Sequence, residues 1–124
     1  MKHNKKNNHL SRKYSHRNSM LSNMACSLII HKSIYTTLSK AKVLRKYIEP
    51  ILSKLKFNNI NSRRIVFSKL KNKKVVNILF KNILNKIKNR NGGYIRILKA
   101  GYRKGDSSKM SIIQLVDYYK YEDL

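Results

Sequence analysis

The sequence predicts an α+β fold: a helix, a strand and three helices, followed by an antiparallel β-hairpin, with a small mixed sheet covered by helices in two layers. Three observations predict it. Apolar residues recur at helical spacing through most of the first 90 positions. A β-branched and aromatic run lies at 33–37, and two alternating segments flank a glycine-containing turn near the C-terminus. At 124 residues and 41% hydrophobic, the chain is long enough for one domain with a buried core.

The first half of the chain predicts two helices around a strand. Ser15 is the expected N-cap of the first helix, whose apolar face carries Leu21, Met24, Ala25, Leu28 and Ile29. The run 33–37 predicts a short strand. A second helix starts near Ser39 and buries Ala41, Leu44, Ile48, Leu52 and Leu55. Pro50 lacks an amide donor and clashes with the preceding turn, so we expect a kink or a restart there.

The second half predicts two more helices and the hairpin. A polar connection at 58–61 leads into a brief helix, and Asn72 is the expected N-cap of the next one. The broad apolar stripe of that helix consists of Val75, Val76, Leu79, Phe80, Ile83, Leu84 and Ile87. We expect Asn91-Gly92-Gly93 to stop it, because glycine takes left-handed dihedrals without a Cβ penalty. Segments 94–100 and 110–116 then pair as strands around a turn at 101–109.

The charge of the chain is extreme and unevenly distributed. Twenty-nine Lys and Arg face five Asp and Glu, a formal net charge of +24, and Glu49 is the sole acid before Asp106. Such a compact monomer repels itself, so we expect a polyanion to supply the missing counter-charge. Nucleic acid is the obvious candidate.

The chain lacks the residue patterns that an enzyme, a metal-binding module or a membrane-spanning protein would need. Carboxylates are scarce and the four His lie among Lys and Arg, so no catalytic constellation is indicated and we do not expect an enzyme. The single Cys26 excludes an intramolecular disulfide and a cysteine-based zinc module. The longest apolar run is far too short to span a bilayer. We therefore expect an intracellular protein without cofactor, metal, small-molecule substrate or membrane.

Three parts are predicted along the chain. Residues 1–14 form a basic N-terminal extension, interpreted either as a frayed terminus or as a segment that orders on RNA. Residues 15–117 form a single α+β domain, and 118–124 form a short acidic tail. From Asp106 onward two Lys face four acids, so we expect this end to face away from phosphate. In the hairpin, glycines make the bend while Arg103 and Lys104 project outward, and Tyr94 and Tyr102 could each stack on a base.

Several motifs together resemble one known family. They are Ser15-His16-Arg17-Asn18-Ser19-Met20, Asn23-Met24-Ala25, Thr36-Thr37 through Lys40-Ala41-Lys42, Glu49-Pro50, Arg63-Arg64, and the block from Gly92-Gly93-Tyr94 to Arg103-Lys104-Gly105-Asp106. In this order and spacing the chain resembles bacterial large-subunit ribosomal protein seventeen, the bL17 family, from Met1 to about Val116.

The resemblance implies a structural constituent of the large (50S) ribosomal subunit in the cytoplasm, which binds 23S rRNA near the nascent-chain exit region. It implies neighbouring large-subunit ribosomal proteins as further partners, and we do not expect a homo-oligomer. The positions that it assigns to rRNA contact are Lys2, His3, Lys5, Lys6, Arg12, His16, Arg17, Lys40, Lys42, Arg63, Arg64, Arg90, Gly92, Gly93, Tyr94, Arg96, Lys99, Arg103 and Lys104.

Two other function classes remain as alternatives. A free basic DNA-binding protein of the nucleoid type is the first, although no dimerisation stripe or groove-entering arm is evident. A membrane-surface amphipathic protein is the second. It needs a basic helix with exposed Phe or Trp, whereas the chain has no Trp and its three Phe lie in apolar stripes.

Overall fold

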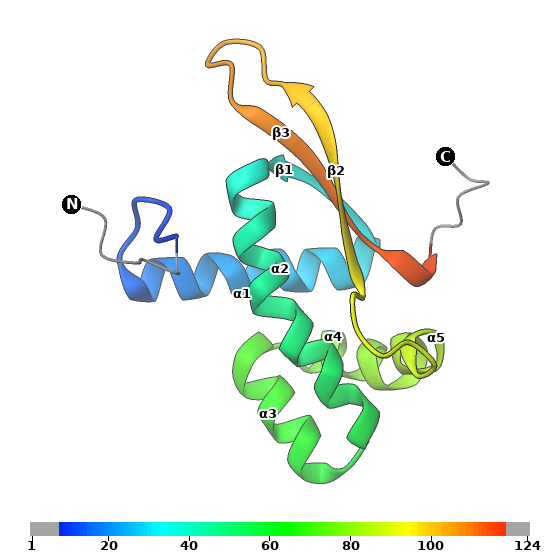
Figure 1. The fold of residues 1–124 in the computed structure, drawn as a ribbon. Helices are drawn as coiled ribbons and strands as arrows, with labels where there is room; N and C mark the ends of the chain where they lie inside the picture. The colour runs from blue at the N-terminus through cyan, green and yellow to red at the C-terminus, as the bar shows by residue number, and fades with distance from the viewer. Residues whose placement is uncertain (1–7, 119–124) are drawn as a thin grey trace.

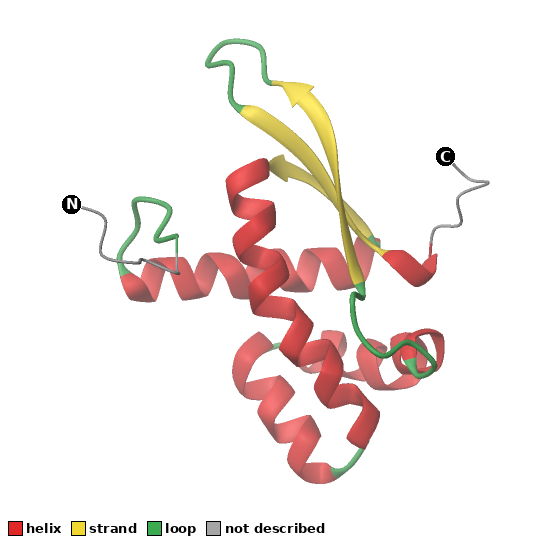
Figure 2. Ribbon diagram, viewed as in Figure 1, coloured by secondary structure: helices red, strands yellow, loops and turns green. Residues whose placement is uncertain are grey.

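The computed structural model describes residues 8–118, and the predicted α+β class is confirmed. In chain order the elements are α1 (Tyr14–His31), β1 (Ser33–Thr37), α2 (Leu38–Lys54), α3 (Ile60–Leu70), α4 (Lys73–Ile78), α5 (Leu84–Ile87), β2 (Ile95–Tyr102) and β3 (Lys109–Leu115) (Figure 1). Short 3-10 turns at Leu55–Phe57 and Val116–Tyr118 follow α2 and β3. The strands lie together at one end of the molecule, and α3, α4 and α5 lie at the other (Figure 2).

The sheet has three strands in the order β1-β3-β2. Both pairings are antiparallel, so the prediction of a mixed sheet is wrong in this detail. The hairpin places β3 beside β2, and the helices between β1 and β2 bring β1 to the other edge of β3. The direction of β1 relative to the hairpin depends on that long connection, which local sequence patterns do not specify.

The structure corrects the predicted cap of the first helix and excludes the restart that was one of two alternatives for the second. Helix α1 begins at Tyr14 after Lys13, which makes no side-chain capping bond, so Ser15 lies inside the helix and does not cap it. Helix α2 continues through Pro50 to Lys54 without a restart. Its predicted buried stripe runs across the proline, with Ala41, Leu44, Ile48, Leu52 and Leu55 all fully buried. Burial on both sides of Pro50 offsets the loss of one backbone hydrogen bond.

The last helical segment begins as predicted and ends early. The Asn72 side chain accepts hydrogen bonds from the amides of Lys74 (3.0 Å) and Val75 (3.3 Å), as an N-cap does. A π-helical turn at Leu79–Ile83 joins α4 to α5, and α5 ends at Ile87. Asn91-Gly92-Gly93 therefore does not stop the helix. Gly93 instead has a φ of +63°, which turns the chain into β2.

The core lies between the helices and one face of the sheet. Helix α2 contacts all three strands and also packs against α1 and α3. Ile113 of β3 is fully buried in this core, and its cross-strand partners Ile34 and Ile97 pack against it from the two edge strands. The loop between β2 and β3 projects away from the helices (Figure 1). The fold thus carries cationic residues on surfaces that the core leaves free.

Candidate nucleic-acid interface

All three carboxylates in the described part of the chain are used in contacts within the protein. Glu49 accepts from two backbone amides, Asp106 pairs with Arg103, and Asp117 pairs with Arg90. Glu49 binds backbone amides, and Asp106 and Asp117 each pair with one arginine outside the helices, so three acids face a much larger number of cations. The surplus of positive charge therefore stays on the surface, where a polyanion can reach it.

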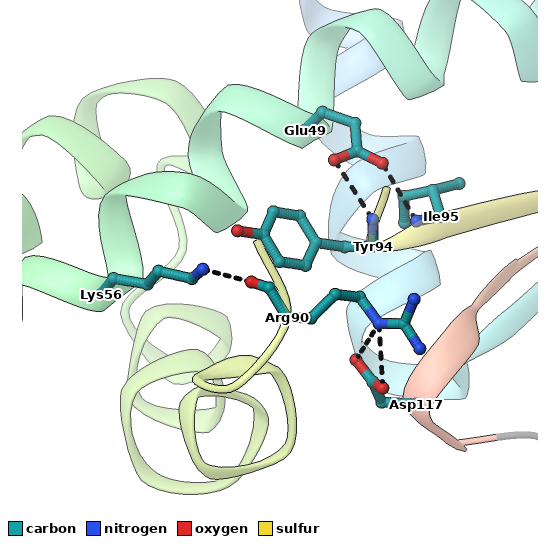
Figure 3. Close-up of polar contacts among 6 residues, drawn as sticks. All are labelled: Glu49, Lys56, Arg90, Tyr94, Ile95 and Asp117. Carbon is teal, nitrogen blue, oxygen red and sulfur yellow. Dashed lines mark hydrogen bonds and ion pairs between the residues drawn. The ribbon is translucent and has the colours of Figure 1, made fainter. Parts of the chain in front are cut away.

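The loop that precedes β2 is braced from two sides (Figure 3). The amides of Tyr94 and Ile95 donate to the two carboxylate oxygens of Glu49 on α2, at 3.3 and 3.0 Å. Lys56 donates to the carbonyl oxygen of Arg90 and lies over the Tyr94 ring, 5.4 Å from its centroid. On the opposite side, Arg90 Nε lies 3.1 Å from Asp117. The loop backbone is thus held in place without a ligand.

Gly92 and Gly93 are exposed within this braced loop. A Cβ atom at either position would have no atom within 4 Å, so neither glycine is needed to avoid a clash inside the protein. The open space leaves the backbone accessible to a close approach from outside. This arrangement is consistent with their predicted contact to RNA.

The tip of the hairpin presents cations on a turn that is hydrogen-bonded through Asp106. Arg103 donates through Nε to Asp106 (3.1 Å), and the Ser108 amide donates to the same carboxylate (3.2 Å). Hydrogen bonding to Arg103, and then to Ser108, holds the pKa of Asp106 well below its ordinary value. Lys104 lies exposed between them. The prediction that Arg103 and Lys104 project outward is confirmed.

The remaining predicted contacts are spread over α1, α2, α3 and the sheet. His16, Lys42, Arg63, Arg64 and Lys99 are exposed, while Arg12, Arg17, Lys40, Arg90 and Arg96 are half-buried. Two of the arginines lie over aromatic rings, Arg17 over Tyr14 at 5.6 Å and Arg63 over Phe80 at 4.6 Å. The structure thus does not gather the predicted residues into a single pocket. Lys2, His3, Lys5 and Lys6 lie outside the described residues.

One aromatic prediction is wrong and one exposed aromatic was missed. Tyr94 is only 1% exposed, and its ring packs in the core, so it cannot stack on a base. Tyr102 is 69% exposed, as base stacking requires. Tyr35 was predicted only as part of a strand, yet it is 60% exposed. The alternation of side chains along a strand could have predicted this exposure, because the neighbouring Ile34 faces the core.

Within residues 8–118, no helix is both long enough and apolar enough to cross a membrane. The same part of the chain contains no cluster of three or more His, Cys, Asp or Glu that could hold a metal ion.

The fold and the charge distribution define a small α+β protein with a large surplus of surface cations over carboxylates. Comparison with known proteins identifies it further: the family described as Ribosomal protein L17 matches residues 20–116. The chain belongs to this family.

Curated relatives agree with that assignment. The chain is 58% identical over 118 residues to the large ribosomal subunit protein bL17 of Parabacteroides distasonis. The alignment covers 95% of this chain and 73% of the relative. It is 58% identical to the protein of the same name from Porphyromonas gingivalis, with 95% of this chain and 74% of the relative covered. The bL17 protein of Amoebophilus asiaticus is 51% identical over 121 residues, 98% of this chain and 62% of the relative.

Proposed function

We propose that the protein is a structural constituent of the large ribosomal subunit and that it binds 23S rRNA through its basic surface. The observation that carries the proposal is that every carboxylate among residues 8–118 is used within the protein. The relatives are all called large ribosomal subunit protein bL17, and this name supports the large ribosomal subunit as the particle that the protein joins. The role is structural and needs no catalytic group.

The proposed contact is electrostatic and distributed. Lys42 on α2, Arg64 on α3 and Lys104 in the hairpin lie on separate elements, so they can reach phosphates from several rRNA segments. The braced loop adds an exposed backbone at Gly92 and Gly93. Such a surface positions a protein on folded RNA without reading its sequence.

The two ends of the chain have separate roles in this proposal. The basic extension 1–14 orders on rRNA as it binds. Because Lys109 is exposed on the hairpin, only the acidic tail 118–124, and not the whole end from Asp106 onward, faces away from phosphate. Helix α1 begins at Tyr14, so the extension leads directly into the first helix. The family resemblance supports a location near the nascent-chain exit region, with other large-subunit proteins as neighbours.

Sucrose-gradient sedimentation of a lysate tests the proposal. We expect the full chain to sediment with large subunits at low salt and to move to the top of the gradient after ribonuclease treatment. Lys104→Glu should lower the amount bound, whereas Lys81→Glu, which changes an exposed lysine outside the predicted contacts, should lower it less. A chain that stays at the top with or without ribonuclease refutes the proposal. Co-sedimentation with the nucleoid that only deoxyribonuclease abolishes would favour the DNA-binding alternative.

A further inference from the structure

The sheet has a second face that lies outside the helix-covered core. Ile34, Ile113 and Ile97 face the core, so side chains one position along each strand point to the opposite face. The register places three of these in one row across the sheet: Tyr35 on β1, Ile112 on β3 and Leu98 on β2. None of the three belongs to the core or to the residues packed against it.

This row forms a short apolar strip with an aromatic ring at one end. Tyr35 is 60% exposed on an edge strand, while Ile112 and Leu98 are half-buried beside it. Neighbours in a cross-strand row lie close enough for their side chains to touch. The ring of Tyr35 therefore stands at the border of a flat apolar surface and is open to a planar ligand.

The next row on the same face supplies a guanidinium in a defined position. Ser33, Gln114 and Arg96 are paired across the three strands, and Gln114 is only 3% exposed. With the amide oxygen of Gln114 turned toward Arg96, that oxygen accepts from Nη2 at 2.5 Å and from Nε at 2.9 Å. Gln114 thus holds the Arg96 guanidinium against the sheet beside the apolar row.

Cations of the hairpin lie at the other side of the row. Arg103 is exposed, and hydrogen bonding to Asp106 is the main cause that raises its pKa, with a smaller electrostatic effect from Tyr35. The Nε of Arg103 donates to Asp106 at 3.1 Å, which holds the guanidinium on the hairpin turn. Lys104 and Lys109 are exposed on the same hairpin. The phosphates on either side of a bound base could therefore contact Arg103, Lys104 or Lys109.

We propose that the sheet face formed by Tyr35, Leu98, Ile112 and Arg96 binds an unpaired nucleobase of the rRNA, which stacks on the Tyr35 ring. An exposed aromatic ring bordered by arginines and lysines is the combination that binds single-stranded nucleic acid. A base inside a duplex has both faces stacked already, so the occupant is a nucleotide from a loop or bulge. This inference rests on the proposed rRNA binding and adds a base contact to the phosphate contacts.

Chemical probing of assembled large subunits tests the inference. Subunits that carry Tyr35→Ala should show a several-fold increase in reactivity at one or a few unpaired nucleotides, relative to subunits with the unchanged chain. Tyr35→Phe keeps the ring and should keep the protection. Phe57→Ala is the matched control, because Phe57 is 67% exposed but lies on the turn after α2. An identical reactivity pattern for Tyr35→Ala and the unchanged chain overturns the inference.

A photo-crosslinking measurement avoids dependence on the alanine variant. With p-azidophenylalanine at position 35 in assembled subunits, we expect a crosslink to an unpaired rRNA nucleotide, mapped as a reverse-transcription stop. A crosslink to a ribosomal protein, or none to rRNA, overturns base stacking while the chain remains in the subunit. If the unchanged chain is itself absent from large subunits, the proposed function fails, and this inference fails with it.

Discussion

Replacing Glu49 should destabilise the protein more than any other single carboxylate change in the described chain. Glu49 accepts hydrogen bonds from the amides of Tyr94 and Ile95, which lie 45 and 46 positions along the chain. Both residues are buried, at 1% and 6% exposure. Glu49→Ala therefore leaves two amides at the start of β2 without their acceptor and releases the strand from α2.

The size of the effect follows from the two bonds. A hydrogen bond to a charged group contributes about 1.5–3 kcal/mol, and a buried donor left without a partner costs a similar amount. Glu49 itself is half-buried, so water replaces part of the loss. We expect Glu49→Ala to lower the free energy of unfolding by about 2–4 kcal/mol. Glu49→Gln keeps one acceptor oxygen and should cost about 1–2 kcal/mol.

Urea unfolding followed by far-ultraviolet circular dichroism and tyrosine fluorescence measures the change. Asp106→Asn is the matched control: it also removes a carboxylate, but its ion pair is exposed and we expect a small effect. Hydrogen exchange at the Tyr94 and Ile95 amides should accelerate in both Glu49 variants. If the free energy of unfolding of Glu49→Ala lies within about 0.5 kcal/mol of that of the unchanged protein, Glu49 does not anchor β2.

Three further predictions test the core, the braced loop and the hairpin. Leu44→Ala, at a fully buried position of α2, should lower the free energy of unfolding by about 2–5 kcal/mol in the same urea assay, and a loss below about 1 kcal/mol would contradict its place in the core. Asp117→Asn should release Arg90 and speed trypsin cleavage after it several-fold, whereas an unchanged cleavage rate would show that the ion pair does not brace the loop. Because the folded-state pKa of Asp106 lies below the ordinary value of 3.8, its stabilising effect is complete at neutral pH and disappears only as pH falls through that lower pKa. A carboxyl-carbon NMR titration should place the midpoint below 3.8, and a midpoint at or above it would contradict the hydrogen bonds to Arg103 and Ser108.

Elements whose signals are local were predictable from the sequence. The strand at Ser33–Thr37 has the bounds that its β-branched and aromatic run predicts. Asn72 caps the helix it was predicted to cap, because an N-cap depends on residues two and three positions away. At Pro50 the helix does not restart, which was one of the two predicted outcomes, because burial of the flanking stripe outweighs the local propensity of proline.

The candidate interface was less predictable because its geometry depends on contacts between distant residues. The sequence shows Glu49 as a lone acid among cations, but not that it binds the amides of Tyr94 and Ile95. Gly92 and Gly93 were predicted to stop a helix, yet they lie in an exposed loop after the helix has ended, and Tyr94 next to them is buried. Whether a tyrosine in a strand faces the core or the surface depends on which sheet face the helices cover, and that is a tertiary property.

The salt dependence of binding to 23S rRNA measures how many phosphates the cationic surface contacts. If the cationic surface contacts about ten phosphates, the logarithm of the association constant should fall with the logarithm of salt concentration at a slope of about −7 to −9. The same protein should bind duplex DNA of equal length more weakly at every salt concentration. A slope shallower than about −3, the value for three or four phosphates, or tighter binding to DNA, would contradict the account.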